Sequence, residues 1–253
     1  MQVTFLGTGT SQGVPIIGCD CDVCLSTNKK DKRLRCSIFL KWDDFSLVID
    51  SGPDFRYQLL REEINDIDAV LYTHEHKDHV AGLDDIRPIN YLQNKSIDIY
   101  GSHLVETALK REFHYIFADT KYPGAPRINF NLITNNAFQL GPINVLPIEG
   151  LHYRLPVFGY RIKDFCYITD MNFISEEEKS KMKDLDVLVI NGLRREKHIS
   201  HFTLEEALEM IAELKPKQAY ITHMSHQLGT HEEVSKELPE NVQLSYDGLK
   251  INL

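Results

Sequence analysis

Long hydrophobic runs are absent from the 253-residue sequence. No stretch approaches the roughly 18 apolar residues that a membrane-spanning helix needs. The first residues, MQVTFLGTGTS, also lack the basic and then apolar layout of a secretory signal. These absences predict a cytoplasmic protein without membrane contact. The length suffices for a single domain over residues 1–253 that buries its own core.

Basic residues are outnumbered in this chain. There are 28 Lys and Arg against 37 Asp and Glu, which gives a formal net charge of −9 and a pI near 5.6. Such a surface repels polyanions unless metals or a local basic patch reverse the field. We therefore do not expect long nucleic acid to be a partner.

Cysteine is scarce and odd in number, with five residues. Thiols stay reduced inside cells, so we expect no disulfide scaffold. Three of the five crowd into GCDCDVC, as Cys19, Cys21 and Cys24. They could form a redox pair through Cys21-x-x-Cys24 or contribute to a metal site. Cys36 and Cys166 lie within apolar runs, where we expect small buried side chains.

Short apolar runs rich in β-branched and aromatic residues recur along the chain and predict strands. They are QVTFLG, CSIFLKW, FSLVID, DAVLYT, IDIYG, INVLPI, FGYRI, FCYIT, DVLVIN, QAYITH and LKINL. Helical patterns cover 55–64, 79–93, 104–117, 176–183 and 203–214. The last opens with Thr203 and Glu206, the spacing of a capping box. This order favours an α/β fold in which mixed sheets carry helices on their outer faces.

One long stretch, 119–136, fits neither pattern. It contains YPGAPR and is too polar and too rich in proline for a core element. We predict an irregular segment, either a plain surface loop or a loop that overhangs an active site.

The densest group of metal-ligand residue types lies in LYTHEHKDHVAGL, residues 71–83. An apolar strand ends near Thr73, and His74, His76, Asp78 and His79 follow before a predicted helix. Imidazole and carboxylate side chains so closely spaced, on the turn between a strand and a helix, can converge on more than one metal ion.

The His-x-His-x-Asp-His pattern resembles the signature of the metallo-β-lactamase superfamily. The resemblance covers essentially the whole chain and implies a four-layer αββα sandwich with two divalent ions, manganese or zinc, at one edge. It also implies ligands at the ends of later strands, and the matching residues are His152, Asp170 and His223. One ion would be held by His74, His76 and His152. The other would be held by Asp78, His79 and His223, with Asp170 between the two.

Asp50 ends the run FSLVID and resembles the family's buried aspartate that hydrogen-bonds a ligand histidine. The alternative is an ordinary turn at a strand end, formed by DSGPD.

The three N-terminal cysteines match one branch of the superfamily, similar to the phosphoribosyl cyclic phosphodiesterase of phosphonate breakdown. In that branch a Cys-x-Cys-x-x-Cys joins a histidine in a structural zinc site, and His226 in THMSH supplies the fourth position here. Four such ligands close a tetrahedral zinc and leave no position for water. A redox pair would leave Cys19 and His226 unexplained. The stretches FLGTGTSQGVP, with Gly7 and Gly9, and GLDDIRP resemble the same branch.

A general acid is expected at His201, because HISHFT resembles the His-x-Thr element of the superfamily's phosphodiesterases. That histidine protonates the leaving group there. We count Asp78 with His201 among the catalytic residues. Arg87 could clamp a phosphate with two hydrogen bonds, or it could be an ordinary surface arginine. We assign no role to the remaining histidines, His103, His114, His198 and His231.

The resemblance implies a metal-dependent phosphodiesterase for a small, cyclic or nucleotide-like phosphodiester. In this reading a hydroxide bridging the ions attacks phosphorus and His201 protonates the departing oxygen. The related enzyme is a homodimer, which implies the same here.

Four alternatives stay open. A tRNA 3′-processing nuclease normally carries a basic, Gly-rich arm, which we do not find in this acidic sequence. A hydroxyacylglutathione-type thioesterase usually adds a C-terminal helical domain, whereas this sequence ends on LKINL. True β-lactamases generally lack the equivalent of His79. A carrier protein, like the superfamily member implicated in quinone cofactor biosynthesis, would need no intact catalytic site.

Overall fold

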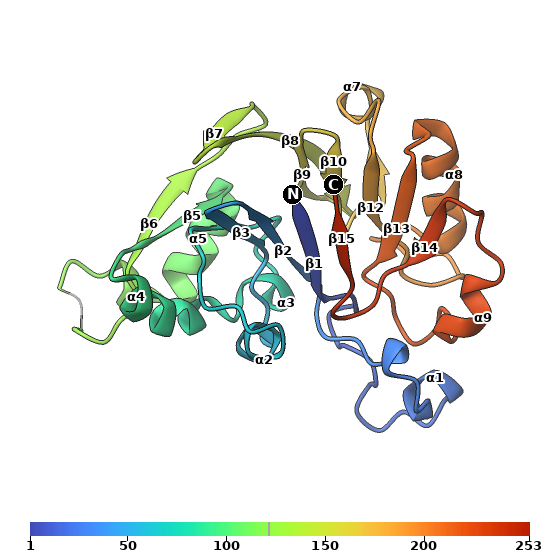
Figure 1. Cartoon of the computed structure of the whole chain (residues 1–253), viewed down its shortest axis with the longest axis horizontal. Coiled ribbons are helices and arrows are strands. Elements are labelled where there is room, and N and C mark those ends of the chain that lie inside the picture. Colours follow the sequence, from blue (N-terminus) through green and yellow to red (C-terminus); the bar gives the residue numbers. More distant parts are fainter. Residues whose placement is uncertain (121) are drawn as a thin grey trace.

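The computed structural model describes residues 1–120 and 122–253, which form two facing β-sheets with helices on both outer sides (Figure 1). The first sheet has the order β15 (Lys250–Asn252), β1 (Gln2–Gly7), β2 (Ser37–Trp42), β3 (Phe45–Ile49), β4 (Ala69–Leu71), β5 (Ile97–Gly101) and β6 (Ile128–Leu132). The second has the order β11 (Phe173–Ile174), β8 (Ile143–His152), β9 (Leu155–Ile162), β10 (Phe165–Tyr167), β12 (Val187–Asn191), β13 (Gln218–Thr222) and β14 (Val242–Leu244), and β7 (Phe138–Leu140) pairs with β8.

Each sheet is part antiparallel and part parallel. Strands β15, β1, β2 and β3 are antiparallel neighbours, whereas β3 to β6 run parallel. In the second sheet β11, β8, β9 and β10 are antiparallel neighbours, whereas β10, β12, β13 and β14 run parallel. Parallel neighbours end at the same edge of their sheet, so residues that follow β10 and β13 can meet there.

The helices lie on both outer faces of the sheet pair, except α1, which projects with the cysteine-rich N-terminal loop at the bottom of Figure 1. They are α1 (Asp22–Leu25), η1 (Lys29–Asp31), α2 (Phe55–Arg61), α3 (Lys77–Val80), η2 (Leu83–Ile86), α4 (Arg87–Gln93), α5 (His103–Glu112), α6 (His114–Phe117), α7 (Glu176–Ser180), α8 (Leu204–Leu214) and α9 (His231–Ser235).

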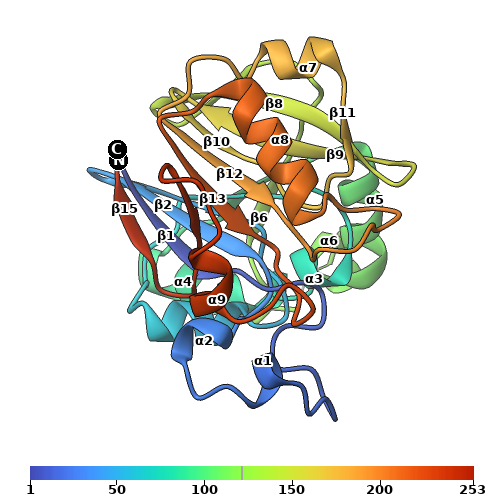
Figure 2. The ribbon, with the colours of Figure 1, turned by 90° about the vertical axis from the view of Figure 1, so that its right-hand side faces the viewer.

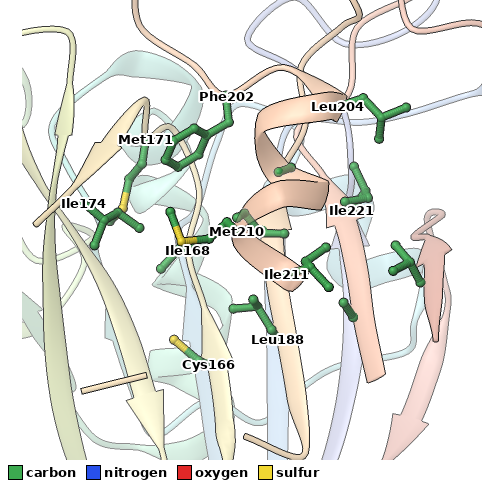
Figure 3. Packing of buried hydrophobic residues seen from close by; sticks show 14 of the residues in the cluster. Cys166, Ile168, Met171, Ile174, Leu188, Phe202, Leu204, Met210, Ile211 and Ile221 are labelled. Atoms are coloured by element: carbon green, nitrogen blue, oxygen red, sulfur yellow. The ribbon is translucent and has the colours of Figure 1, made fainter. Parts of the chain in front are cut away.

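Three apolar layers hold this arrangement together. Buried residues such as Phe5 and Tyr160 fill the space between the sheets. A second layer, including Phe55 and Leu109, lies under the helices of the first sheet. The third packs α8 on the second sheet, where Leu204 and Ile211 of the helix belong to one cluster with Leu188 and other strand residues (Figure 3). The four-layer αββα sandwich expected from the sequence is confirmed, and the capping box of Thr203 and Glu206 is present.

The helix predicted over 79–93 is wrong as a single element. It is split into α3, η2 and α4. Gly82 donates its N–H to Ser51 O at 2.8 Å, outside any helix, and a Cβ on it would lie 2.3 Å from Gly52 O. Pro88 lies in the first turn of α4, where its missing N–H is tolerated, so a new helix has to begin there. The pattern predicted over 104–117 is likewise divided into α5 and α6.

The prediction of an irregular segment over 119–136 is also partly wrong, because β6 lies within it as the edge strand of the first sheet. INFNL alternates Asn with apolar residues, and an edge strand tolerates such polarity. Position 121 of that segment lies outside the described residues. The sequence signals for β7, β11 and β14, each two or three residues long, were too short to be recognised.

The two ends of the chain lie side by side (Figure 2), and Met1 N donates to Leu253 O at 2.9 Å. Across the described residues, we find no helix both long and apolar enough to cross a membrane.

Candidate metal centre

The turn after β4 is held by one buried carboxylate. Oδ1 of Asp50 accepts the N–H of Thr73 at 2.9 Å, and Oδ2 accepts its hydroxyl at 2.8 Å. The same Oδ2 lies 2.7 Å from Nδ1 of His79. A ring that donates from Nδ1 turns the lone pair of Nε2 away from Asp50 and toward the centre. The contact expected between Asp50 and a ligand histidine is therefore present.

The structure brings all seven predicted ligands together in overlapping groups, within each of which the ligand atoms lie within 4.8 Å of one another. One group is His74, His76 and His152; another is His74, His79 and Asp170; a third is Asp78, Asp170 and His223. The first and third match the division of ligands between two ions that the sequence predicted, apart from His79.

Asp170 lies between these groups. Its Oδ1 is 2.9 Å from Nδ1 of His223 and 3.4 Å from Nε2 of His79. Its Oδ2 faces the other way, 3.8 Å from Nε2 of His74. A carboxylate whose two oxygens face different ligand groups has the placement expected of a bridging ligand.

His152, at the end of β8, is oriented by a backbone carbonyl. Its Nδ1 lies 2.9 Å from Ser200 O, and because a carbonyl only accepts, Nδ1 carries the proton and Nε2 is free to bind a metal. Burial lowers the pKa of this ring to about 4. The neutral form that metal binding needs is therefore the one present near pH 7.

The donor set fits divalent cations. Nε2 of His74, of His79 and of His223 are buried and have no hydrogen-bond partner among the described residues, a condition that is costly unless a metal binds them. Burial lowers the pKa of His79, yet Asp170, Asp78 and Asp50 together raise it well above its usual value. Burial likewise lowers and Asp170 raises the pKa of His223, with a net rise to about 10. The site therefore stabilises positive charge despite its burial.

His201 faces the same centre. Its Nε2 lies 3.3 Å from Oδ2 of Asp170, and the ring is 4.6 Å from that of His152. Burial lowers its pKa, and the hydrogen bond and charge of Asp170 oppose that shift.

Three residues near the centre adopt a left-handed backbone. Asp50, Asp170 and His223 have φ values of 64°, 57° and 55°. Each follows the end of a strand, so the chain reverses there and the side chain is directed at the strand edge. Non-glycine residues in this region are uncommon and often mark functional sites.

The cysteine cluster is a second group of ligands. Sγ of Cys19 and Sγ of Cys21 lie 3.2 and 3.3 Å from Nδ1 of His226, and Cys24 completes a set within 4.8 Å. The N–H of Cys24 and the ring of His226 lower the pKa of Cys21 to about 6, despite the opposing effect of burial. Four soft and borderline donors in this arrangement fit tetrahedral zinc.

Gly9 lets the N-terminal loop run beside β13. It bridges to Met224, next to His223, and a Cβ on it would lie 2.9 Å from Cβ of Arg33. Cys36 and Cys166 are buried as expected, and Cys36 Sγ also lies 3.1 Å from Oγ1 of Thr222.

The guanidinium group of Arg87 is hydrogen-bonded to neighbouring residues. Its Nη2 donates to Asp84 at 3.0 Å and its Nη1 to Gly124 O at 3.3 Å, so it ties the 119–136 segment to α4. Whether it also binds phosphate stays a prediction.

A cavity of about 540 Å³ opens beside the centre and holds residues that the sequence analysis missed. It is lined by His76, His152, Tyr153, Arg154, Leu155, Ile199 and Ser200. Arg154 lies over the ring of Tyr153, 5.0 Å from its centroid, and makes no ion pair among the described residues. The sequence signal was a basic residue two positions after His152 in an acidic chain.

The sequence matches the profile of the β-lactamase superfamily domain over residues 46–224. The chain is 38% identical to a solved diphosphatase of the PhnP family, with a TM-score of 0.93, and the match covers 100% of this chain and 97% of that one. It also resembles the fold of zinc-bound PqqB from Methylobacterium extorquens, with 19% identity, a TM-score of 0.77 and full coverage of both chains.

Curated relatives carry two different names. An octanoyltransferase of Porphyromonas gingivalis is 39% identical over 99% of this chain and 51% of that protein. A ribonuclease Z of Nostoc punctiforme is 27% identical over 73% of this chain and 52% of that protein. The chain thus spans about half the length of the curated relatives it matches.

The sandwich, the ligand clusters at its edge and the profile match define a hydrolase fold: the chain belongs to the metallo-β-lactamase superfamily. Within it, the chain lies in the PhnP-like branch.

Proposed function

We propose that the chain is a metal-dependent phosphodiesterase that acts on a small cyclic or nucleotide-like phosphodiester. The observation that carries the proposal is the position of His201, whose Nε2 lies 3.3 Å from Asp170 at the junction of the two ligand groups. A phosphodiester's leaving oxygen needs a proton, and a histidine at this point can donate one.

Two divalent ions held by the seven ligands would supply an activated water and neutralise charge on the phosphoryl group. The ligands themselves are oriented by the protein, His79 through Asp50 and His152 through Ser200 O. His201 donates its Nε2 proton to the departing oxygen. The cavity that contains His76 and His152 has room for a small ester. We assign a structural zinc to Cys19, Cys21, Cys24 and His226, which fixes the N-terminal loop to the segment after β13.

The ligands come from both sheets, which supports residues 1–253 acting as one domain. The homodimer and the cytoplasmic location stay predictions. A nuclease is the second candidate, because ribonuclease Z relatives match more than half of the chain. The net charge of −9 favours a small substrate over tRNA.

The test compares substrates for the metal-loaded chain. We expect hydrolysis of bis(p-nitrophenyl) phosphate and of a cyclic phosphodiester, and little action on an octanoyl thioester, a cephalosporin or a precursor tRNA. Metal analysis should give three ions per chain, and a carrier protein would hold only the zinc. The proposal fails if only the thioester is cleaved, or if nothing is.

A further inference from the structure

The residues around Nδ1 of His201 have no assigned role, although they make close contacts. Nδ1 of His198 lies 3.0 Å from Nδ1 of His201, and Oγ of Ser200 is also 3.0 Å away. His198 is partly buried and belongs to the segment 192–203 that connects β12 to α8. The two imidazoles have a centroid separation of 4.9 Å.

Donor and acceptor roles in this contact follow from the backbone. The N–H of Ser200 points at Nδ1 of His198 at 3.4 Å, and a backbone N–H can only donate. Nδ1 of His198 is therefore an acceptor with its lone pair turned toward Ser200 and His201. A hydrogen bond between the two Nδ1 atoms then requires the proton to be on His201.

The other nitrogen of His201 faces the centre. Because the Nδ1 proton is held by His198, Nε2 is the nitrogen that gains and loses a proton. Without an acceptor at position 198, neutral His201 would carry its proton on Nε2, which faces Oδ2 of Asp170 at 3.3 Å. From that state the imidazolium that donates from Nε2 forms only when Nδ1 gains a proton, and His198 would no longer be there to accept a hydrogen bond from it.

We propose that His198 is a positioning residue that keeps a proton on Nδ1 of His201, so that Nε2 exchanges protons with the leaving group. This inference rests on the proposed function, in which His201 is the general acid. The same short segment orients His152 through Ser200 O. The short segment that contains His198 and Ser200 therefore determines which ring nitrogen carries the proton in both His152 and His201.

Ser200 is a weaker candidate for this role. Its hydroxyl can donate as well as accept, so it can adapt to either proton position of His201. We expect Ser200→Ala to change turnover less than about threefold, because the backbone N–H and C=O of residue 200 remain.

The variants to compare are His198→Ala, which removes the acceptor, and His198→Asn, whose side-chain oxygen can take the place of Nδ1. His103→Ala is the matched control, because His103 has a side chain 80% exposed and lies on α5. Two substrates separate acid catalysis from structural damage. A cyclic phosphodiester expels an alkoxide that needs a proton, whereas bis(p-nitrophenyl) phosphate expels a stable phenolate.

We expect His198→Ala to lower kcat for the cyclic ester by about 30-fold, less than the roughly 10²–10⁴ of a complete loss of general acid catalysis, because His201 itself remains. Turnover of the nitrophenyl ester should fall less than about threefold. His198→Asn should restore the cyclic ester to within about threefold of wild type. Equal losses on both esters, or no loss on either, would overturn the proposal.

An NMR measurement tests which nitrogen of His201 carries the proton without an activity assay. In ¹⁵N-histidine-labelled, zinc-loaded protein, two-bond ¹H–¹⁵N correlations report which nitrogen carries the proton, and His201 is assigned from a His201→Ala spectrum. We expect the Nδ1–H form in wild type and in His198→Asn, and a shift toward Nε2–H in His198→Ala. An unchanged tautomer in His198→Ala overturns the proposal. If wild type cleaves neither ester, the proposed function fails, and this spectrum still tests His198.

Discussion

Oδ2 of Asp50 lies 2.7 Å from Nδ1 of His79, and both side chains are fully buried. This pair connects the end of β3 to the turn that carries most of the histidines proposed as metal ligands. Because Asp50 also binds Thr73 through both oxygens, one carboxylate holds the backbone of that turn and the orientation of a ligand ring.

Replacing Asp50 with Asn should weaken metal binding. If the amide oxygen of the new side chain accepts the N–H of Thr73, its NH₂ group faces Nδ1 of His79. Both groups donate, so the hydrogen bond that orients His79 is lost. We expect metal affinity to fall by about 10–100-fold, as for other residues that orient ligands. Metal retention against a graded series of chelator concentrations measures this. Asp66→Asn, which removes a half-exposed partner of Lys41, is the control and should retain metal like wild type.

His223 and His226 lie three positions apart and should report on different metal sites. His223→Ala should remove a catalytic ion and abolish turnover, while one zinc per chain remains. His226→Ala should lose that zinc and lower Tm by about 5 °C, the shift that a loss of about 2 kcal/mol gives in a chain of this size. Metal analysis and thermal melting measure both. Loss of the same ion in the two variants would contradict two separate sites.

Arg154 should matter for substrate binding more than Arg87. Arg154 lines the cavity beside His76 and His152 and has no acidic partner in the described part of the chain, whereas Arg87 is paired with Asp84. We expect Arg154→Met to raise KM by about 5–20-fold with kcat nearly unchanged, since a charge-assisted hydrogen bond to phosphate is lost. Arg87→Met is the matched control. A larger effect at Arg87 would support the phosphate-binding role that the sequence suggested for Arg87.

His231 should make stability depend on pH. Burial, followed by the charges of Arg33 and Lys30, lowers its pKa to about 4. Nη2 of Arg33 points at Nδ1 of His231 at 3.3 Å, and because Arg33 only donates, the ring is neutral. The unfolded chain therefore binds more protons than the folded one between about pH 6.5 and 4.

The contribution of His231 to the free energy of unfolding should accordingly have its full value above pH 6.5 and decrease as the pH drops toward 4. We expect His231 to account for about 1 kcal/mol of the loss between pH 7 and 5, after allowance for solvent screening. Urea unfolding of wild type and His231→Asn at the two pH values, with equal metal loading, measures this. The variant should lose less stability than wild type, and equal losses would contradict the assignment.

Short-range spacing was enough to predict much of this molecule. The His-x-His-x-Asp-His run and the three cysteines are local patterns, and the apolar runs predicted the central strands. The interruption at Gly82 of the helix predicted over 79–93 could not be predicted from the sequence. It depends on contacts of Gly82 with Ser51 and Gly52, which belong to another segment. Strand β6 was missed because an edge strand needs little apolar surface. Arg154 and His198 were missed because the roles proposed for them depend on which side chains meet in space.

The left-handed backbone at His223 carries a buried charge that pairs with Asp170. Asparagine adopts that conformation more readily than histidine, but it would remove the imidazole whose charge Asp170 stabilises in the metal-free chain. Metal-free His223→Asn should therefore melt at a lower temperature than metal-free wild type near pH 7, and it would also bind one ion fewer. A higher melting temperature would show that backbone strain at this position costs more than the charge pair contributes. Without a metal ion, the proton on His223 thus compensates the buried charge of Asp170.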